Sequence, residues 1–214
     1  RATTADLTQQ KERSEFLMRE LAHRSKNQLA VIRGMAQQTA RQSDSVPDFV
    51  AHFAQRIQGL AQSQDLLLRQ DWQGAWLSDL VMAHLDLFGI RSRTQVEGPP
   101  LFVGAHAVQN LGFALHELGT NATKHGALTL EHGQVHITWR VHEDQGTIEF
   151  EWRERNGPPV GPPTRRGFGQ LVLTQLVAQA LGGTSHLEFL GDGLCWQLTF
   201  PASQTLKLEG KAKA

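Results

Sequence analysis

Apolar residues recur at helical spacing through the first third of the chain. Residues 5–41 contain no proline and one glycine, Gly34, and are rich in Leu, Ala, Gln, Glu, Lys and Arg, which predicts one long helix. The sequence Ser45-Val-Pro-Asp48 combines a capping serine with a proline in the first turn. It predicts the start of a second helix that runs to about Arg69.

The second helix repeats its apolar residues in alternating steps of four and three, a spacing typical of helices that pack against one another. The residues at these steps are Phe49, Phe53, Ile57, Leu60, Gln64 and Leu67. We therefore expect residues 1–70 to form an antiparallel two-helix hairpin for dimerisation, which becomes a four-helix bundle if two copies associate.

Beyond Gly74 the pattern changes to a mixture of helical stripes and alternating strands. It predicts helices at 76–88, 104–126 and 170–181, an extended stretch at 94–103, and two hairpins at 134–152 and 185–200. We expect an α+β protein in which residues 71–203 form a two-layer α/β sandwich with an antiparallel or mixed sheet. Residues 204–214 are polar, and we expect a disordered tail there.

Composition narrows the possible partners and the setting. The 21 basic and 21 acidic residues balance, so no overall field favours nucleic acid or an anionic membrane. The single cysteine, Cys195, is best explained as a small buried residue in a reducing compartment. No apolar run approaches the roughly 20 residues that span a bilayer. We expect this fragment to be cytoplasmic, and we expect a longer parent protein because the sequence does not begin with methionine.

The helix predicted at 104–126 has two distinct faces. Leu111, Leu115, Leu118 and Ala122 form one apolar stripe, whereas Glu117, Asn121 and Lys124 follow at i, i+4 and i+7 on another face. A carboxylate and an amide oxygen one turn apart can bind Mg²⁺, and a lysine one turn further can meet a phosphate. The alternative is an ordinary amphipathic helix with a solvated face.

His23 lies opposite the apolar stripe of the first helix, with Arg24 and Lys26 beside it. An exposed imidazole next to cations can accept a phosphoryl group, because the cations offset the charge of the transferring group. The alternative is a solvent-facing histidine without a function.

Two further stretches suggest a nucleotide site. Glu154 ends a predicted strand, where it could accept a hydrogen bond from an exocyclic amine, and Gly157 follows to allow close approach of a ligand. The Gly- and Pro-rich segment 156–169 predicts a mobile loop whose end, Arg165-Arg-Gly-Phe-Gly169, could meet phosphate through backbone N–H groups. The alternative is a plain loop and helix cap, since the segment is not a Walker loop.

These motifs, in this order, resemble the HWE family of bacterial sensor histidine kinases. The resemblance covers nearly the whole chain: His-Arg-Ser-Lys-Asn at 23–27, His-Glu-Leu-Gly-Thr-Asn-Ala-Thr-Lys-His-Gly-Ala-Leu at 116–128, Trp-Arg-Glu at 152–154 and Arg-Gly-Phe-Gly at 166–169. It implies an ATP-dependent histidine kinase whose N-terminal hairpin carries the phosphoacceptor and whose second domain is of the Bergerat ATP-binding type, shared with gyrase B and MutL.

The resemblance also implies residue roles and partners. His23 would be autophosphorylated, Glu117 would be catalytic and would bind Mg²⁺ with Asn121, and Glu154 would read adenine. The remaining nucleotide-binding roles would fall to His116, Lys124, Gly157, Arg166, Gly167 and Gly169. The phosphate would pass from His23 to an aspartate of a response regulator receiver domain. We expect a homodimer, a sensory domain upstream of this chain, and no role for nucleic acid.

Some residues depart from the family pattern. Asn156 stands where a second glycine is common, and His125 stands where tyrosine is frequent. Arg24 follows the phosphoacceptor in place of the acid of the larger histidine kinase class, so the general base stays unassigned.

Three other functions compete with this interpretation. A zinc hydrolase motif that begins at His116-Glu117 fails because position 120 is threonine. A phosphotransferase or pseudokinase would share the architecture, but we expect a degenerate ATP site to have lost some of its ligands. A helical dimerisation module would explain residues 5–69 but not the pair of Glu117 and Asn121.

Overall fold

The computed structural model describes residues 11, 18, 22, 25–26, 28–41, 43–159, 161 and 167–205. The chain consists of two compact units, residues 1–53 and 54–214, and the boundary falls inside helix α2 (Val46–Arg69). The predicted division of the chain at 70/71 stays a prediction. The second unit includes the C-terminal part of α2, because Leu60, Ser63 and Leu67 are buried there.

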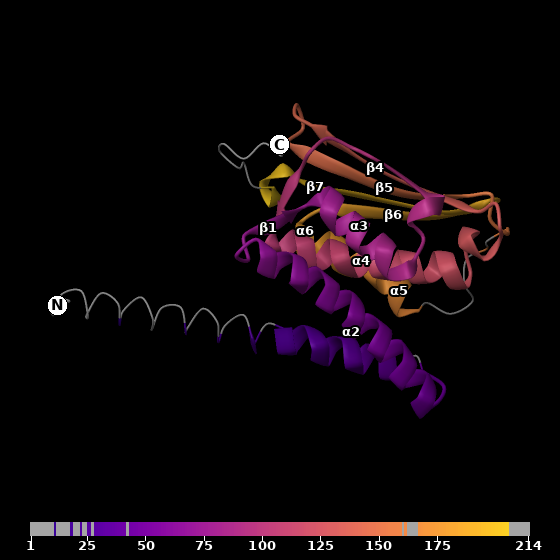
Figure 1. Cartoon of the computed structure of the whole chain (residues 1–214), viewed down its shortest axis with the longest axis horizontal. Coiled ribbons are helices and arrows are strands. Elements are labelled where there is room, and N and C mark those ends of the chain that lie inside the picture. Colours follow the sequence, from indigo (N-terminus) through magenta and orange to yellow (C-terminus); the bar gives the residue numbers. More distant parts are fainter. Residues whose placement is uncertain are drawn as a thin grey trace. The chain divides into compact units, whose positions relative to one another are not determined.

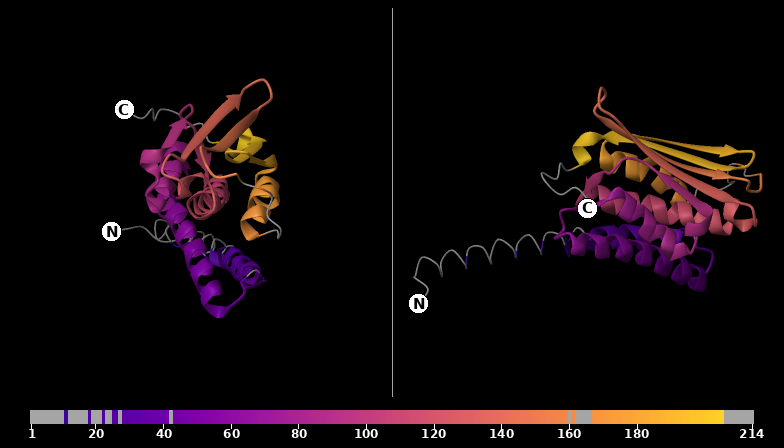
Figure 2. Two further views of the ribbon diagram at one scale, coloured as in Figure 1. Left: turned by 90° about the vertical axis from the view of Figure 1, so that its right-hand side faces the viewer. Right: turned by 45° about the horizontal axis from the view of Figure 1, so that its top comes forward.

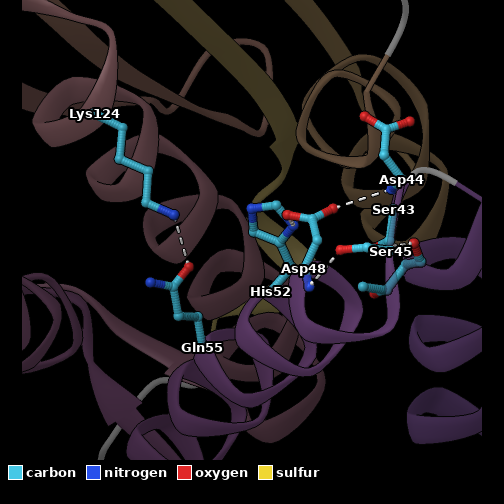
Figure 3. A network of polar contacts seen from close by, with 8 residues as sticks. Ser43, Asp44, Ser45, Asp48, His52, Gln55 and Lys124 are labelled. Carbon is cyan, nitrogen blue, oxygen red and sulfur yellow. Dashed lines mark hydrogen bonds and ion pairs between the residues drawn. The ribbon is translucent and has the colours of Figure 1, made fainter.

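In the described part of the first unit, helical residues lie on both sides of residues 43–45. Residues 28–41 are helical, and α2 begins after the turn at residues 43–45. The backbone N–H of Asp48 donates to Ser45 Oγ at 3.3 Å, and that of Asp44 donates to Asp48 Oδ2 at 3.3 Å (Figure 3). The side chains of Ser45 and Asp48 thus supply acceptors to backbone donors at the helix start, and the predicted start is confirmed.

The second unit is built on a mixed sheet whose strand order is β2-β4-β5-β7-β6. Its strands are β2 (Thr94–Glu97), β4 (Gln134–His142), β5 (Thr147–Arg155), β6 (Thr184–Leu190) and β7 (Gly193–Pro201). Strand β2 pairs with β4 in parallel, and the other pairs are antiparallel. The predicted hairpins and the α+β class are confirmed.

Helices cover one face of this sheet (Figures 1 and 2). They are α3 (Leu77–Phe88), α4 (Ala105–Lys124) and a continuous helical segment formed by α5 (Phe168–Leu171), the π-helical turn Val172–Leu176 and α6 (Val177–Leu181). The prediction of 170–181 was wrong at its start, because Phe168 is buried and its neighbours join the helix.

The core forms where alternate strand residues meet these helices. Val135, Ile137 and Trp139 of β4 are buried, and Ile137 and Trp139 pair with Trp152 and Phe150 of β5. The rings of Trp139 and Phe150 stack with centroids 6.4 Å apart. Because side chains of a strand alternate between faces, the same row on β5 continues to position 154. The fold therefore directs the side chain of residue 154 toward the helices.

Two short strands were missed in the sequence. Strands β1 (Gly74–Trp76) and β3 (Phe102–Gly104) pair with each other, so the extended stretch 94–103 divides between two sheets. The predicted tail was also wrong at its beginning, because Gln204 belongs to a 3₁₀ turn and Thr205 pairs with Val103. Strands this short carry too few alternating residues to be recognised in a sequence. The rest of the predicted tail, 206–214, lies outside the described residues.

Candidate functional site

Helix α4 presents its polar residues in two directions. Leu111, Leu115 and Leu118 are buried, as the apolar stripe predicts. Glu117 is also buried, with 7% of its surface exposed, whereas Lys124 is exposed. The face that carries Glu117 is therefore not the solvated face of an ordinary amphipathic helix, because other elements of the same unit cover it.

A pocket of about 300 Å³ opens beside the C-terminal half of α4. It is lined by residues from α4, from the end of β5, from the glycines around the 161–169 segment and from β6 and β7. The lining residues are Asn121, His125, Gly126, Glu154, Gly161, Gly167, Gly169, Gln170, Leu173, Leu187, Phe189 and Leu194. One part of the pocket is thus apolar, and the other carries polar side chains and glycine backbone.

Glu154 is the fully buried carboxylate of this pocket. Its Oε2 accepts a hydrogen bond from the backbone N–H of Ala127 at 2.8 Å, while Oε1 has no hydrogen-bond partner among the described residues. Burial raises the pKa of the Glu154 carboxyl, and the backbone N–H of Ala127, the side chain of Trp152 and the backbone of Leu194 act in the opposite direction. A buried acceptor without a partner is costly unless a ligand satisfies it.

Two glycines lie so close to the Glu154 side chain that a larger residue would collide with it. A Cβ at Gly126 would collide with Glu154 Oε2, and one at Gly193 would lie 2.6 Å from Glu154 Cβ.

Gly157 does not line the pocket: its N–H donates to Asp192 O, and a Cβ there would lie 2.6 Å from Ala127 Cα. Asn156 has φ +56°, a backbone conformation favoured by glycine and tolerated by asparagine, which explains how asparagine is accommodated there.

Glu117 does not itself line the pocket, but it lies next to Gly169 and Asn121, which do. A Cβ at Gly169 would lie 2.7 Å from Glu117 Oε2 and 3.6 Å from Asn121 Nδ2. The absence of a side chain at Gly169 leaves this space open between a carboxylate oxygen and the amide group of Asn121, whose nitrogen faces it. Carboxylate and amide oxygens are donors that Mg²⁺ prefers. Glu117 and Asn121, one turn apart on α4, are therefore residues of the types that would hold a magnesium ion.

Arg56 of α2 reaches the same carboxylate. Its Nε lies 3.0 Å from Glu117 Oε1, and its guanidinium lies 4.2 Å from the centroid of the Phe168 ring. Sequence reasoning did not identify this residue, because it lies 61 positions from Glu117 in a helix whose pattern indicated only an apolar seam.

His116 and Lys124 do not line the pocket. His116 packs on Gly59 of α2 and lies 5.3 Å from Phe88, centroid to centroid. Burial, followed by the charges of Arg56 and Lys124, lowers the pKa of His116 to about 4. Lys124 Nζ donates to Gln55 Oε1 at 2.9 Å (Figure 3). The structure thus places Asn121, Glu154, Gly167 and Gly169 in the pocket wall, with Glu117 next to Gly169, and leaves His116 and Lys124 outside the pocket lining.

Two predicted site residues, His23 and Arg166, lie outside the described residues. Sequence reasoning also missed part of the pocket wall. Leu187 and Phe189 alternate along β6, and Gln170, whose buried Oε1 has no partner among the described residues, follows Gly169. The alternation of residues along β6 could have indicated which of them share a face of the sheet, but only the packed fold shows that Leu187 and Phe189 line a pocket.

No cluster of metal donors among the described residues supports the alternative of a zinc site. Within residues 43–159 and 167–205 and the described positions before them, no three His, Cys, Asp or Glu side chains are grouped closely enough to hold a metal ion. The pair of Glu117 and Asn121 is a different kind of site, because one of its two donors is an amide.

The geometry agrees with comparisons to known proteins. Residues 20–100 match the family model described as HWE histidine kinase. A blue-light-activated histidine kinase of Brucella ovis is 36% identical over 203 residues, which are 92% of this chain and 42% of that protein. One of Brucella anthropi is 38% identical over 192 residues, 87% of this chain and 39% of that protein. The chain therefore spans about two fifths of these relatives.

The fold has solved counterparts. The structure of the Erythrobacter litoralis EL346 blue-light activated histidine kinase superimposes with a TM-score of 0.64 at 21% identity, covering 95% of this chain and 62% of that one. Its isolated histidine kinase domain gives a TM-score of 0.55 at 16% identity, covering 82% and 95%. Sequence relatives, family model and fold agree, and the chain belongs to the HWE family of histidine kinases.

Proposed function

We propose that this chain binds ATP in the pocket beside α4 and transfers the γ-phosphate to His23. The observation that carries the proposal is Glu154: its Oε1 is buried in a largely apolar pocket without a hydrogen-bond partner among the described residues. A purine with an exocyclic amine satisfies both parts of such a pocket, because its flat ring contacts apolar side chains while its N–H donates to the carboxylate.

The phosphates would extend from this pocket toward Glu117 and Asn121. Magnesium held there would neutralise charge on the phosphate oxygens. Gly167 and Gly169 also line the pocket, and neither presents a side chain to a triphosphate. We propose that the segment around them, with Arg166, closes over the nucleotide and excludes water from it.

Transfer to His23 requires little covalent chemistry from the ATP-binding part. A ring nitrogen of His23 would attack the γ-phosphorus in line, the bond from that phosphorus to the bridging oxygen would break, and ADP would leave. Positioning and charge neutralisation supply most of the catalysis in such transfers. Glu117 is the candidate catalytic residue at the site.

We further propose that the phosphate passes to an aspartate of a response regulator and that residues 1–70 dimerise. Apolar side chains support the second proposal, since Val46 and Val50 are 75% and 56% exposed in the first unit. Light scattering should find a dimer for the chain and a smaller species for Val50→Glu. A wild-type monomer would contradict dimerisation.

We also propose that this part of the protein lies in the cytoplasm. Cys195 is unpaired and buried, which agrees with a reducing, cytoplasmic compartment. None of the described helices combines the length and apolar character needed to cross a membrane.

Incubation with ATP labelled at the γ-phosphate, in the presence of Mg²⁺, tests the kinase proposal. We expect acid-labile label on the wild type and none on His23→Ala or Asn121→Ala. His132→Ala, which changes an exposed histidine outside the pocket, is the matched control and should keep the label. Adding a cognate receiver domain should move the label from the kinase to an aspartate.

Two results would contradict parts of this proposal. Label that survives His23→Ala would place the acceptor elsewhere. Absence of label despite calorimetric binding of ATP would favour a phosphate-relaying pseudokinase.

A further inference from the structure

We propose that Arg56 is a positioning residue for the kinase reaction: it fixes Glu117 and the start of α5 in one arrangement at the phosphate end of the pocket. This inference rests on the proposed function, because it assigns Glu117 to the reacting end of the nucleotide. Arg56 belongs to the part of α2 that is built into the second unit.

The pair of Arg56 and Glu117 is largely buried. The two side chains are 13% and 9% exposed, and Arg56 Nε donates to Glu117 Oε1 at 3.0 Å. By contrast, Arg91 and Asp86 are 3.6 Å apart with side chains 62% and 56% exposed. A surface pair of that kind contributes little, whereas a desolvated charge needs its partner to hold its position.

The pair gives the two carboxylate oxygens different surroundings. Oε1 receives the guanidinium, and Oε2 lies against the backbone of Gly169, in the space that a Cβ at Gly169 would fill. The hydrogen bond from Arg56 to Oε1 opposes a rotation of the carboxylate that would exchange the two oxygens. Arg56 therefore fixes which oxygen faces the glycine turn and Asn121.

A second contact connects Arg56 to the start of α5. The guanidinium lies 4.2 Å from the ring centroid of Phe168, a cation–π distance. Phe168 is the first residue of α5, is 7% exposed and directly follows Gly167. One guanidinium thus contacts both the candidate catalytic carboxylate and the residue between the two pocket glycines.

Both contacts depend on arginine chemistry. A guanidinium is planar, donates through fixed N–H groups and stacks on an aromatic ring at the same time. Lysine at position 56 would keep the charge but would lose the planar contact with Phe168. We therefore expect the conservative variant to restore activity only in part.

The test measures autophosphorylation rate and nucleotide affinity separately for Arg56→Gln, Arg56→Lys and the control Arg91→Gln. Calorimetry with ATP and Mg²⁺ gives the affinity, and the initial rate at saturating ATP gives kcat. We expect Arg56→Gln to lower kcat by about 10- to 100-fold, the effect of losing one hydrogen bond to a charged group, and to change the Kd by less than about 3-fold because Glu154 is untouched. Arg56→Lys should lie between this variant and the wild type, and Arg91→Gln should match the wild type.

Three results would overturn the inference. Unchanged kcat in Arg56→Gln would show that Glu117 needs no such partner. A faster Arg56→Gln would show that Arg56 masks Glu117 instead of positioning it. Parallel loss of kcat, ATP affinity and thermal stability in both Arg56→Gln and Arg56→Lys would indicate a purely structural role. If Arg56→Gln does not fold, Arg56→Lys still decides the test. If the proposed function itself were wrong, the wild type would not bind ATP, and this result distinguishes that failure from the three above.

Discussion

The two oxygens of the Glu154 carboxylate differ in their hydrogen-bond partners. Oε2 accepts the backbone N–H of Ala127 at 2.8 Å, and Oε1 is buried without a hydrogen-bond partner among the described residues. Val135 pairs with Glu154 across the β4–β5 ladder, so the carboxylate continues a buried row of the sheet. One oxygen thus anchors the side chain, and the other is available to a ligand.

Replacement of Glu154 by glutamine should separate binding from stability. The amide oxygen can still accept the Ala127 N–H, but the NH₂ group then opposes the amine of adenine. We expect ATP affinity to fall about 10- to 100-fold, since a hydrogen bond to a charged group is worth roughly 1.5–3 kcal/mol. Removal of a buried charge should leave the free energy of unfolding unchanged or higher.

Calorimetry and urea unfolding measure these two quantities. Glu151→Gln is the matched control, because Glu151 lies on the opposite face of β5 and contacts Gln197 at 2.7 Å. Equal ATP affinity in the two variants would show that Glu154 does not read the base.

Gly169→Ala should damage the phosphate end of the pocket. Its Cβ would lie 2.7 Å from Glu117 Oε2, so the carboxylate or the start of α5 must shift. We expect kcat to fall about 100-fold, the cost that misplacement by about 1 Å can have. Gly191→Ala, whose Cβ meets nothing within 4 Å, should behave as wild type in the same assay. Normal phosphorylation by Gly169→Ala would show that this space is not needed.

Two buried histidines should make stability fall in mild acid. Burial and then the charge of His116 lower the pKa of His84 to about 3, and that of His116 is lowered to about 4. Both therefore bind protons more readily in the unfolded chain, and stability is lost as pH falls below the unfolded value of 6.5. Each histidine contributes a slope of about 1.4 kcal/mol per pH unit within this window.

Urea unfolding at several pH values between 7.5 and 5 measures that slope. His84→Gln removes one of the two groups and can still hydrogen-bond to Ser63, whose Oγ lies 3.2 Å from His84 Nε2. We expect a shallower loss of stability in this variant. The same slope in both proteins would mean that His84 is not buried as a neutral ring.

Two glycines in helices should respond to alanine with opposite signs. A Cβ at Gly59 would lie within 2.5 Å of the His116 ring, so Gly59→Ala should destabilise the second unit by about 1–3 kcal/mol through overpacking. A Cβ at Gly34 meets nothing within 4 Å, so Gly34→Ala should stabilise its helix by roughly 0.5–1 kcal/mol. Thermal unfolding compares the two, and a stabilising Gly59→Ala would contradict the close packing of α2 on His116.

The sequence alone determined most of the helices and strands and two polar residues of the pocket, Asn121 and Glu154. Alternation along 134–141 and 147–152 defined a hairpin, and helical spacing placed Glu117 and Asn121 one turn apart. These are local patterns, because a strand or helix repeats its faces over a few residues. The capping serine at position 45 is likewise a local signal, and it was read correctly.

Tertiary structure decided which of these residues act together. His116 and Glu117 are neighbours in sequence, yet one packs on Gly59 and Phe88 and the other pairs with Arg56, 61 residues away. Strand pairing and helix packing bring such distant residues into contact, and no spacing within a sequence encodes that contact. Likewise, the sequence did not predict that Glu154 Oε1 is buried without a hydrogen-bond partner among the described residues, because that burial depends on how the sheet and the helices pack.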